Sequence, residues 1–188
     1  MFDEEKVKQG VRLILEGIGE DVDREGLKET PDRIARMYRK IFSSVGCPNE
    51  DLSAKVFEIE NNHMVIERNI TYYSMCEHHL LPFFGRAAIA YVPDGEVIGL
   101  SKLARIVDFC SYKPQLQERL TDDIAHTVSR KVKNKGVFVL LEAEHLCVSM
   151  RGVKKPGSST VTMASTGCFL EDKDKRDEVL SLIRQAAY

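Results

Sequence analysis

The sequence predicts an α+β fold, in which helices cover one face of an antiparallel sheet. Apolar side chains first recur at helical spacing, and from about residue 54 they alternate in short strand-like runs. Helical spacing returns between residues 101 and 136, and strand-like and helical segments then follow in turn. Strands that flank a central pair of helices are typical of a sheet with helices packed against one side.

The first 50 residues predict a separate helical region. Residues 4–18 carry one apolar stripe, and a second helix is expected to start at Thr30-Pro31, with threonine as its cap and proline in its first turn. The run from Gly46 to Asn49 is expected to end this helix. We therefore divide the chain into an N-terminal helical region, residues 1–50, and a larger domain, residues 51–188, which holds most of the candidate chemical residues described below and is called the catalytic domain.

Elements of the catalytic domain follow from the change of period and from turn residues. Ser101 is expected to cap a helix that Lys113-Pro114 ends, and a further helix is expected to stop at Gly136. The C-terminal helix is expected over residues 172–187. Strands are expected at residues 56–59, 64–66, 70–75, 86–92, 137–150 and 160–168.

Composition and charge limit the class of protein. The 188 residues are 43% hydrophobic and 30% charged, which indicates a globular chain, and the net charge of −2 argues against general binding to nucleic acid or to a membrane surface. No apolar run approaches the ~20 residues that span a bilayer. The charged N-terminus lacks a signal-peptide core, so we expect a cytoplasmic protein whose five cysteines are thiols or metal ligands.

The strongest chemical signal is a set of three candidate metal ligands. Cys76 and His79 are three positions apart in an expected turn, and Cys147 lies downstream on the expected strand 137–150. If that strand stays extended, His145, Cys147 and Arg151 share one face. Two thiols and one imidazole form a known catalytic zinc set with an open position. A polar loop and an ordinary buried cysteine are the alternatives.

Other polar residues could serve proton transfer or substrate binding, each with a structural alternative. His78 and His145 could exchange protons or only orient a ligand. Ser101, Lys102 and Arg105 open a helix, where they could bind an anion or stay solvated. Gln117 and Glu118 could read the edge of a guanine or pterin, or form a favourable acidic first turn. Further positive charge comes from Arg151, Arg33 and Arg36.

Ordered motifs along the chain resemble the GTP cyclohydrolase I family. They are SMCEHH at residues 74–79, VIGLSK at 97–102, PQLQERLT at 114–121, HLC at 145–147 and, in the N-terminal region, ETPDRIARMY at 29–38. The resemblance implies the tunnelling fold and a decamer of two pentamers with active sites between subunits. It also implies GTP as the substrate, and 7,8-dihydroneopterin triphosphate and formate as the products.

The resemblance also assigns roles to matching residues. Cys76, His79 and Cys147 match the ligands of one Zn²⁺ per subunit, and His78, His145 and Ser101 match catalytic positions. Gln117 and Glu118 match residues that anchor the guanine ring. The ribose and triphosphate positions are matched by Lys102, Arg105, Arg151, Arg33 and Arg36. Residues 109–113 (FCSYK) replace a segment that often carries two arginines, so phosphate contacts from this loop are not expected.

Two other classes of function remain open from the residues alone. A related tunnelling-fold enzyme, such as a nitrile reductase acting on a pterin or deazapurine, would need a nucleophilic cysteine and no metal. A structural zinc protein or nucleotide-binding regulator would close the site with a fourth ligand, His78 or His145. Loss of activity on chelation would exclude the metal-independent enzyme. A fourth protein ligand on the metal would indicate the structural or regulatory protein.

Overall fold

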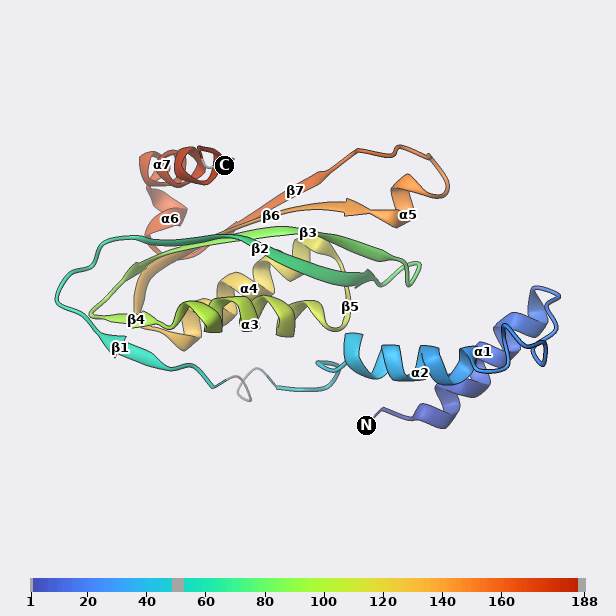
Figure 1. The fold of residues 1–188 in the computed structure, drawn as a ribbon. Helices are drawn as coiled ribbons and strands as arrows, with labels where there is room; N and C mark the ends of the chain where they lie inside the picture. Colours follow the sequence, from blue (N-terminus) through green and yellow to red (C-terminus); the bar gives the residue numbers. More distant parts are fainter. Residues whose placement is uncertain (1, 49–52, 186–188) are drawn as a thin grey trace. The chain divides into compact units, whose positions relative to one another are not determined.

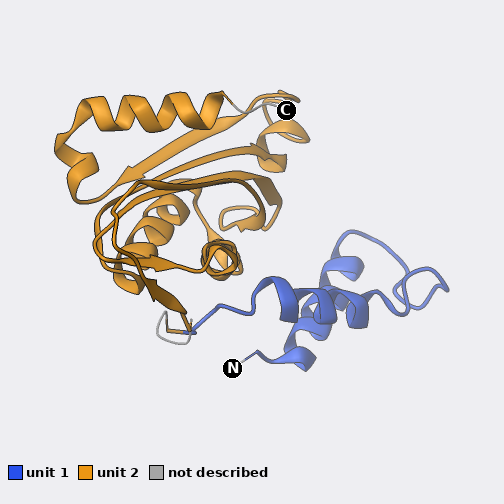
Figure 2. Ribbon diagram, turned by 60° about the vertical axis from the view of Figure 1, so that its left-hand side comes forward, with its two compact units in different colours: residues 1–47 blue, residues 48–188 orange. Residues whose placement is uncertain are grey.

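The computed structural model describes residues 2–48 and 53–185. The chain forms two compact units, residues 1–47 and residues 48–188, which are coloured separately in Figure 2. We describe each unit by itself. Among the described residues, no helix has the length and apolar character needed to cross a membrane.

The first unit is a pair of helices, α1 (Glu4–Gly17) and α2 (Thr30–Ile41). Helix α2 begins at Thr30 itself with Glu29 in the N-cap position, so the prediction that Thr30 caps the helix is wrong; Pro31 does lie in the first turn, as expected. Lys8 of α1 pairs with Glu4 and, across the helix pair, with Asp32. The buried apolar residues of these helices are Val11, Pro31 and Ala35.

The second unit is built on a five-stranded sheet of order β5-β2-β3-β6-β7. All neighbours are antiparallel except the short β5, which runs parallel to the end of β2. The strands are β2 (Val65–Cys76), β3 (Pro82–Pro93), β5 (Pro114–Gln115), β6 (Asn134–His145) and β7 (Thr160–Ser165), and a separate two-stranded sheet contains β1 (Val56–Glu58) and β4 (Glu96–Ile98). The two strands predicted at residues 64–66 and 70–75 are one strand, with a register shift between Glu67 and Ile70.

Helices cover both faces of this sheet, although unequally (Figure 1). The pair α3 (Leu100–Ser111) and α4 (Gln117–Lys131) packs on one face and encloses the main apolar core, which confirms the predicted α+β layering. On the other face, α6 (Cys168–Glu171) and α7 (Lys173–Arg184) bury Phe169 and Val179 against Ala90 and Phe138. Alternate side chains of β3 and β6 therefore enter two different cores.

Several predicted element ends are wrong, and one of them affects the site. Strand β6 ends at His145, and the next residues form the helical turn α5 (Leu146–Ser149), so the extended strand does not reach residue 150. Helix α3 begins at Leu100 with Gly99 at its N-cap position, so Ser101 is not the cap. Helix α4 ends at Lys131 and Gly136 lies within β6, where a side chain would collide with backbone atoms of Thr166 and Cys168.

Candidate metal centre and active site

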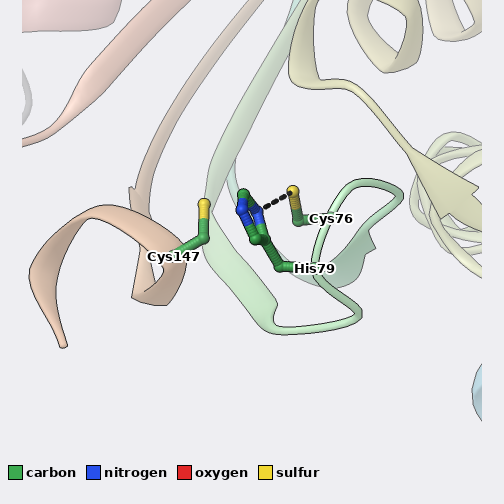
Figure 3. A group of neighbouring side chains, drawn as sticks. All are labelled: Cys76, His79 and Cys147. Atoms are coloured by element: carbon green, nitrogen blue, oxygen red, sulfur yellow. Dashed lines mark hydrogen bonds between the residues drawn. The ribbon is translucent and has the colours of Figure 1, made fainter. Parts of the chain in front are cut away.

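The three predicted metal ligands meet at one end of the sheet (Figure 3). Cys76 is the last residue of β2, and backbone bonds from the amides of His79 and Leu80 to the Cys76 carbonyl fold the following turn back on it. Cys147 arrives from α5, directly after β6. The ligand atoms of Cys76, His79 and Cys147 all lie within 4.8 Å of one another.

The donor set and its spacing fit a tetrahedral zinc ion. The distance from Cys76 Sγ to His79 Nδ1 is 3.8 Å, and the usual Zn–S and Zn–N lengths place such atoms about 3.6 Å apart. Burial, together with the neighbouring Cys76 thiol, raises the pKa of Cys147. Two adjacent thiols resist forming two thiolates unless a cation compensates their charge, so the cluster suits a metal ion.

Arg151 contacts the outer edge of His79. Its guanidinium lies against Nε2 of the imidazole, while Nδ1 faces Cys76. Since the extended strand predicted through residue 150 ends at His145, Arg151 reaches His79 from the loop that follows α5. The structure therefore brings a cation predicted for phosphate binding next to a predicted metal ligand.

His145 is held rigidly beside the cluster. Its ring stacks in parallel on Phe83, its partner across the β3–β6 pair, with 4.7 Å between the ring centroids. Its Nε2 lies 2.6 Å from Oε1 of Gln117. Burial lowers the pKa of His145, and the charge of nearby Glu118 opposes that effect. The neutral ring, which can accept a proton, is therefore favoured near neutral pH.

The other two residues predicted to act at this end are exposed. His78 precedes His79 in the turn, and the two rings meet edge to face with 6.1 Å between their centroids. Glu118 leaves the first turn of α4 with its side chain exposed. Both residues are therefore accessible to a ligand that approaches the cluster from solvent.

Gln117 differs from the residue that the resemblance implies. Only 2% of it is exposed, and its amide nitrogen is within hydrogen-bond distance of the Leu141 and Thr160 carbonyl oxygens and of Thr162 Oγ1. Its amide oxygen faces His145. Both ends of this side chain are therefore engaged with protein groups.

A second hydrogen-bonded chain, which the motifs did not reveal, secures the ligand turn. Glu77, between two site residues, pairs with Arg119 of α4, whose Nε donates to Oε1 of Gln115 at 2.8 Å. Gln115 is fully buried and donates in turn to Asp123 and to the Cys110 carbonyl. The backbone amide of Glu77 also donates to the Gln115 carbonyl. The sequence did offer one signal for this chain of contacts, because Glu77 is a charged residue between the two predicted ligands Cys76 and His79.

Within one chain, the structure does not bring Ser101, Lys102 and Arg105 to this cluster. They begin α3 just after β4, where the Ile98 amide donates to the Tyr91 hydroxyl. Tyr91 pairs with Val65 at one end of β3, whereas Pro82 pairs with Met75 beside the ligands at the other end. Nine positions of extended strand span about 30 Å. The helix start and the metal ligands thus lie at opposite ends of the sheet (Figure 1).

Arg33 and Arg36 lie on α2, in the first unit. Arg33 pairs with Glu29 one turn earlier at 2.7 Å, and the charge of Arg36 contributes to lowering the pKa of Asp32. Both arginines therefore already have acidic neighbours on their own helix.

The layered α+β fold, with a Cys2His cluster at the end of its sheet, is that of a tunnelling-fold enzyme. A family model described as GTP cyclohydrolase I matches residues 7–184. The chain belongs to this family, and its activity is that of a GTP cyclohydrolase.

Two curated relatives agree closely with the chain. GTP cyclohydrolase 1 of Clostridium perfringens (strain 13 / Type A) is 56% identical over 183 residues, which cover 97% of this chain and 99% of the relative. GTP cyclohydrolase 1 of Streptococcus pneumoniae (strain ATCC 700669 / Spain 23F-1) is 52% identical over 182 residues, with the same coverage of both chains. The solved structure of apo archaeosine synthase QueF-Like covers 57% of this chain and 97% of its own, at 20% identity and a TM-score of 0.48.

Proposed function

We propose that this protein converts GTP and water into 7,8-dihydroneopterin triphosphate and formate, with one Zn²⁺ per subunit bound by Cys76, His79 and Cys147. The supporting observation is the convergence of these three side chains beside His145, in a chain of the GTP cyclohydrolase I family. Three ligands leave a fourth position for water, which favours a catalytic over a closed structural site.

The chain's own residues carry the proton transfers. Bound zinc would supply Lewis acidity and lower the pKa of a water molecule toward ~7. As water adds to carbon 8 of the guanine, His145 or His78 takes a proton from that water and passes it to the ring nitrogen that becomes the leaving group. The ring opens to a formamide, and a second water molecule cleaves its remaining bond from carbon 8 to nitrogen, so that formate departs. Ser101 and His78 then move protons while the ribose opens, rearranges and closes to the pterin.

Substrate binding is divided between a base site and a basic cluster. The exposed Glu118 carboxylate accepts hydrogen bonds from the ring N–H and exocyclic amine of guanine, and Arg151 lies close enough to the cluster to meet an anion near the reacting ring. The triphosphate is bound by Lys102, Arg105, Arg33 and Arg36. The resemblance places Gln117 with Glu118 at the guanine, a role that the engaged Gln117 amide does not favour.

We propose a homo-oligomer, a decamer of two pentamers, in which active sites lie between subunits. Two features support this assembly. The α3 start of one chain is about 30 Å from the ligands of that chain, so a neighbouring copy must supply it. The outer edge of β2 is paired with β5 only at Met75 and Cys76 among the described residues, and exposed apolar side chains lie on β2 and on the edge strand β7: Tyr73, Val161 and Met163.

The product is a pterin triphosphate, so we assign the enzyme to the start of folate or tetrahydrobiopterin synthesis, in the cytoplasm. Regulation by an allosteric ligand is compatible with sites shared between subunits.

Metal analysis combined with an absorbance assay tests the function. We expect one zinc per chain, formation of dihydroneopterin triphosphate from GTP, and loss of turnover after chelation that zinc restores. Turnover that survives complete metal removal would contradict the proposal and favour a cysteine nucleophile. A metal-loaded protein that binds GTP without releasing formate would favour a nucleotide-binding regulator.

A further inference from the structure

Gln117 joins His145, the proposed catalytic histidine, to a set of buried and partly buried polar groups. It is the first residue of α4, and its side chain points into the space between that helix, β6 and β7. The nitrogen-to-acceptor distances are 3.3 Å to Leu141 O, 2.9 Å to Thr160 O and 3.1 Å to Thr162 Oγ1. On the other side, 2.6 Å separates Oε1 from His145 Nε2.

These neighbours fix which way the amide of Gln117 faces. The carbonyl oxygens of Leu141 and Thr160 accept hydrogen bonds and cannot donate them. A flipped amide would set its own oxygen against both carbonyl oxygens and its NH₂ group toward His145. Amide orientation is assigned from such networks, and here only the NH₂ group satisfies the carbonyls.

The two threonine hydroxyls agree with the same assignment. Thr121 Oγ1 donates to the Gln117 backbone carbonyl at 2.7 Å, which uses its only proton. Thr162 Oγ1, 2.6 Å from Thr121 Oγ1, must therefore donate to Thr121, and its own lone pair accepts from Gln117 Nε2. One arrangement of protons is consistent with this set, with the two protons of the Gln117 NH₂ group shared among its three acceptors.

The orientation of the Gln117 amide determines which nitrogen of His145 carries a proton. Because Gln117 Oε1 can only accept, the imidazole nitrogen that faces it must carry a proton. A neutral ring has one N–H, so Nδ1 then holds the free lone pair. Within residues 2–48 and 53–185, His145 Nδ1 has no hydrogen-bond partner. The stack on the fully buried Phe83 also fixes the plane of the ring.

We infer that Gln117 is a positioning residue for His145 rather than a guanine anchor. It selects the Nε2–H tautomer and leaves Nδ1 as the nitrogen that exchanges a proton with the substrate. Hydrogen bonds among Gln117, Thr121 and Thr162 join α4 to β7. The packing of these two elements therefore fixes the Gln117 amide, which in turn orients the His145 ring. The inference rests on the proposed function for the identity of the substrate, but the tautomer itself does not depend on it.

A kinetic comparison separates the two roles. Gln117→Met keeps the length of the side chain and removes both polar ends. We expect kcat for formate release to fall about 100-fold, since a mispositioned acid or base loses much of its contribution, while KM for GTP changes less than threefold. A guanine anchor predicts the reverse, a KM raised tenfold or more with kcat retained, and that result would overturn the inference.

A double variant makes the comparison stricter. If Gln117 acts through His145, adding Gln117→Met to His145→Ala should change the residual rate less than threefold. A further 100-fold loss in that background would contradict the inference. Thr127→Val is the matched control, because Thr127 is buried on the same helix about 15 Å further along. We expect its kcat and KM to stay within twofold of the wild type.

A spectroscopic measurement on the wild-type oligomer does not depend on whether variants fold. Histidine labelled with ¹⁵N can be observed by solid-state NMR, and His145→Gln assigns its signals among the five histidines. We expect a pyridine-like Nδ1 and a pyrrole-like Nε2; the opposite pattern would overturn the tautomer assignment. Absence of formate release in the wild type would refute the proposed function, and the nitrogen spectrum would still test the tautomer.

Discussion

The two chemically important ends of the sheet are constructed differently. At the metal end, Cys76 and Gln117 are buried, His145 and Cys147 are partly buried, and most site side chains have hydrogen-bond or stacking partners in the same chain. At the other end, Ser101 and Arg105 are exposed on the first turns of α3. Bond breaking needs fixed atoms, whereas binding of a triphosphate tolerates mobile cations. One chain therefore holds the metal ligands and His145, and we propose that a neighbour adds Ser101 and the cations.

Removal of a metal ligand should have the largest effect. We expect Cys147→Ser to lose zinc and to reduce formate release at least 1000-fold, because Lewis acid catalysis disappears together with the third ligand. Metal content measured by mass spectrometry and turnover measured by absorbance check both effects. Cys47→Ser, at an exposed cysteine of the first unit, is the control and should retain zinc and activity.

Removal of a cation at the far end should impair binding more than chemistry. For Arg105→Ala we expect KM for GTP to rise about 10- to 100-fold with kcat nearly unchanged, since a charge-assisted phosphate contact contributes about 1.5–3 kcal/mol. Steady-state kinetics over a range of GTP concentrations provides the measurement.

Mixing the two variants tests whether sites are shared. Cys147→Ser and Arg105→Ala subunits, dissociated and reassembled together, should form some sites that contain one intact metal end and one intact cation end. Turnover at low GTP should then exceed that of either variant alone. Mixed oligomers with no gain over the separate variants would show that each site belongs to a single chain.

Loss of support behind the ligand turn should have an intermediate effect. Glu77→Gln removes the ion pair with Arg119, which connects the turn to buried Gln115. We expect zinc affinity to fall about 10-fold, as is usual for residues that orient a ligand, without loss of all activity at saturating zinc. Competition with a chromogenic chelator measures the affinity. An unchanged affinity would mean that backbone bonds alone hold the turn.

The exposed charges of the first unit should give the smallest effect. Hydrogen bonds from Lys8 lower the pKa values of Glu4 and Asp32, with Arg39 also contributing at Glu4. A folded pKa below the unfolded one stabilises the helix pair above about pH 4, and that stabilisation is lost as pH falls further. Thermal unfolding followed by circular dichroism between pH 3 and 7 should show the wild type more stable than Lys8→Met near pH 7. This difference in stability should shrink as the pH falls below about 4.

Local rules predicted most elements and missed those that depend on distant contacts. The helices near residues 4–18 and 30–41 and the strands at both sides of the ligand turn follow from periodicity and turn residues. Local rules predict a helix stop at Gly136, but in the structure this glycine permits close approach of β6 to residues 166–168. Ser101 and Thr30 are residue types that commonly cap helices. However, α3 begins one position before Ser101, and α2 begins at Thr30 itself.

The sequence by itself determined the donor types and the family, because thiols, imidazoles and ordered motifs are chemical identities that need no coordinates. Only the tertiary structure decided which of these groups meet. Strand register set Phe83 beside His145, a helical turn after β6 carried Cys147 to Cys76, and the α4–β7 contact engaged Gln117 inside the protein. Such contacts join residues up to 71 positions apart, and local spacing does not encode that proximity.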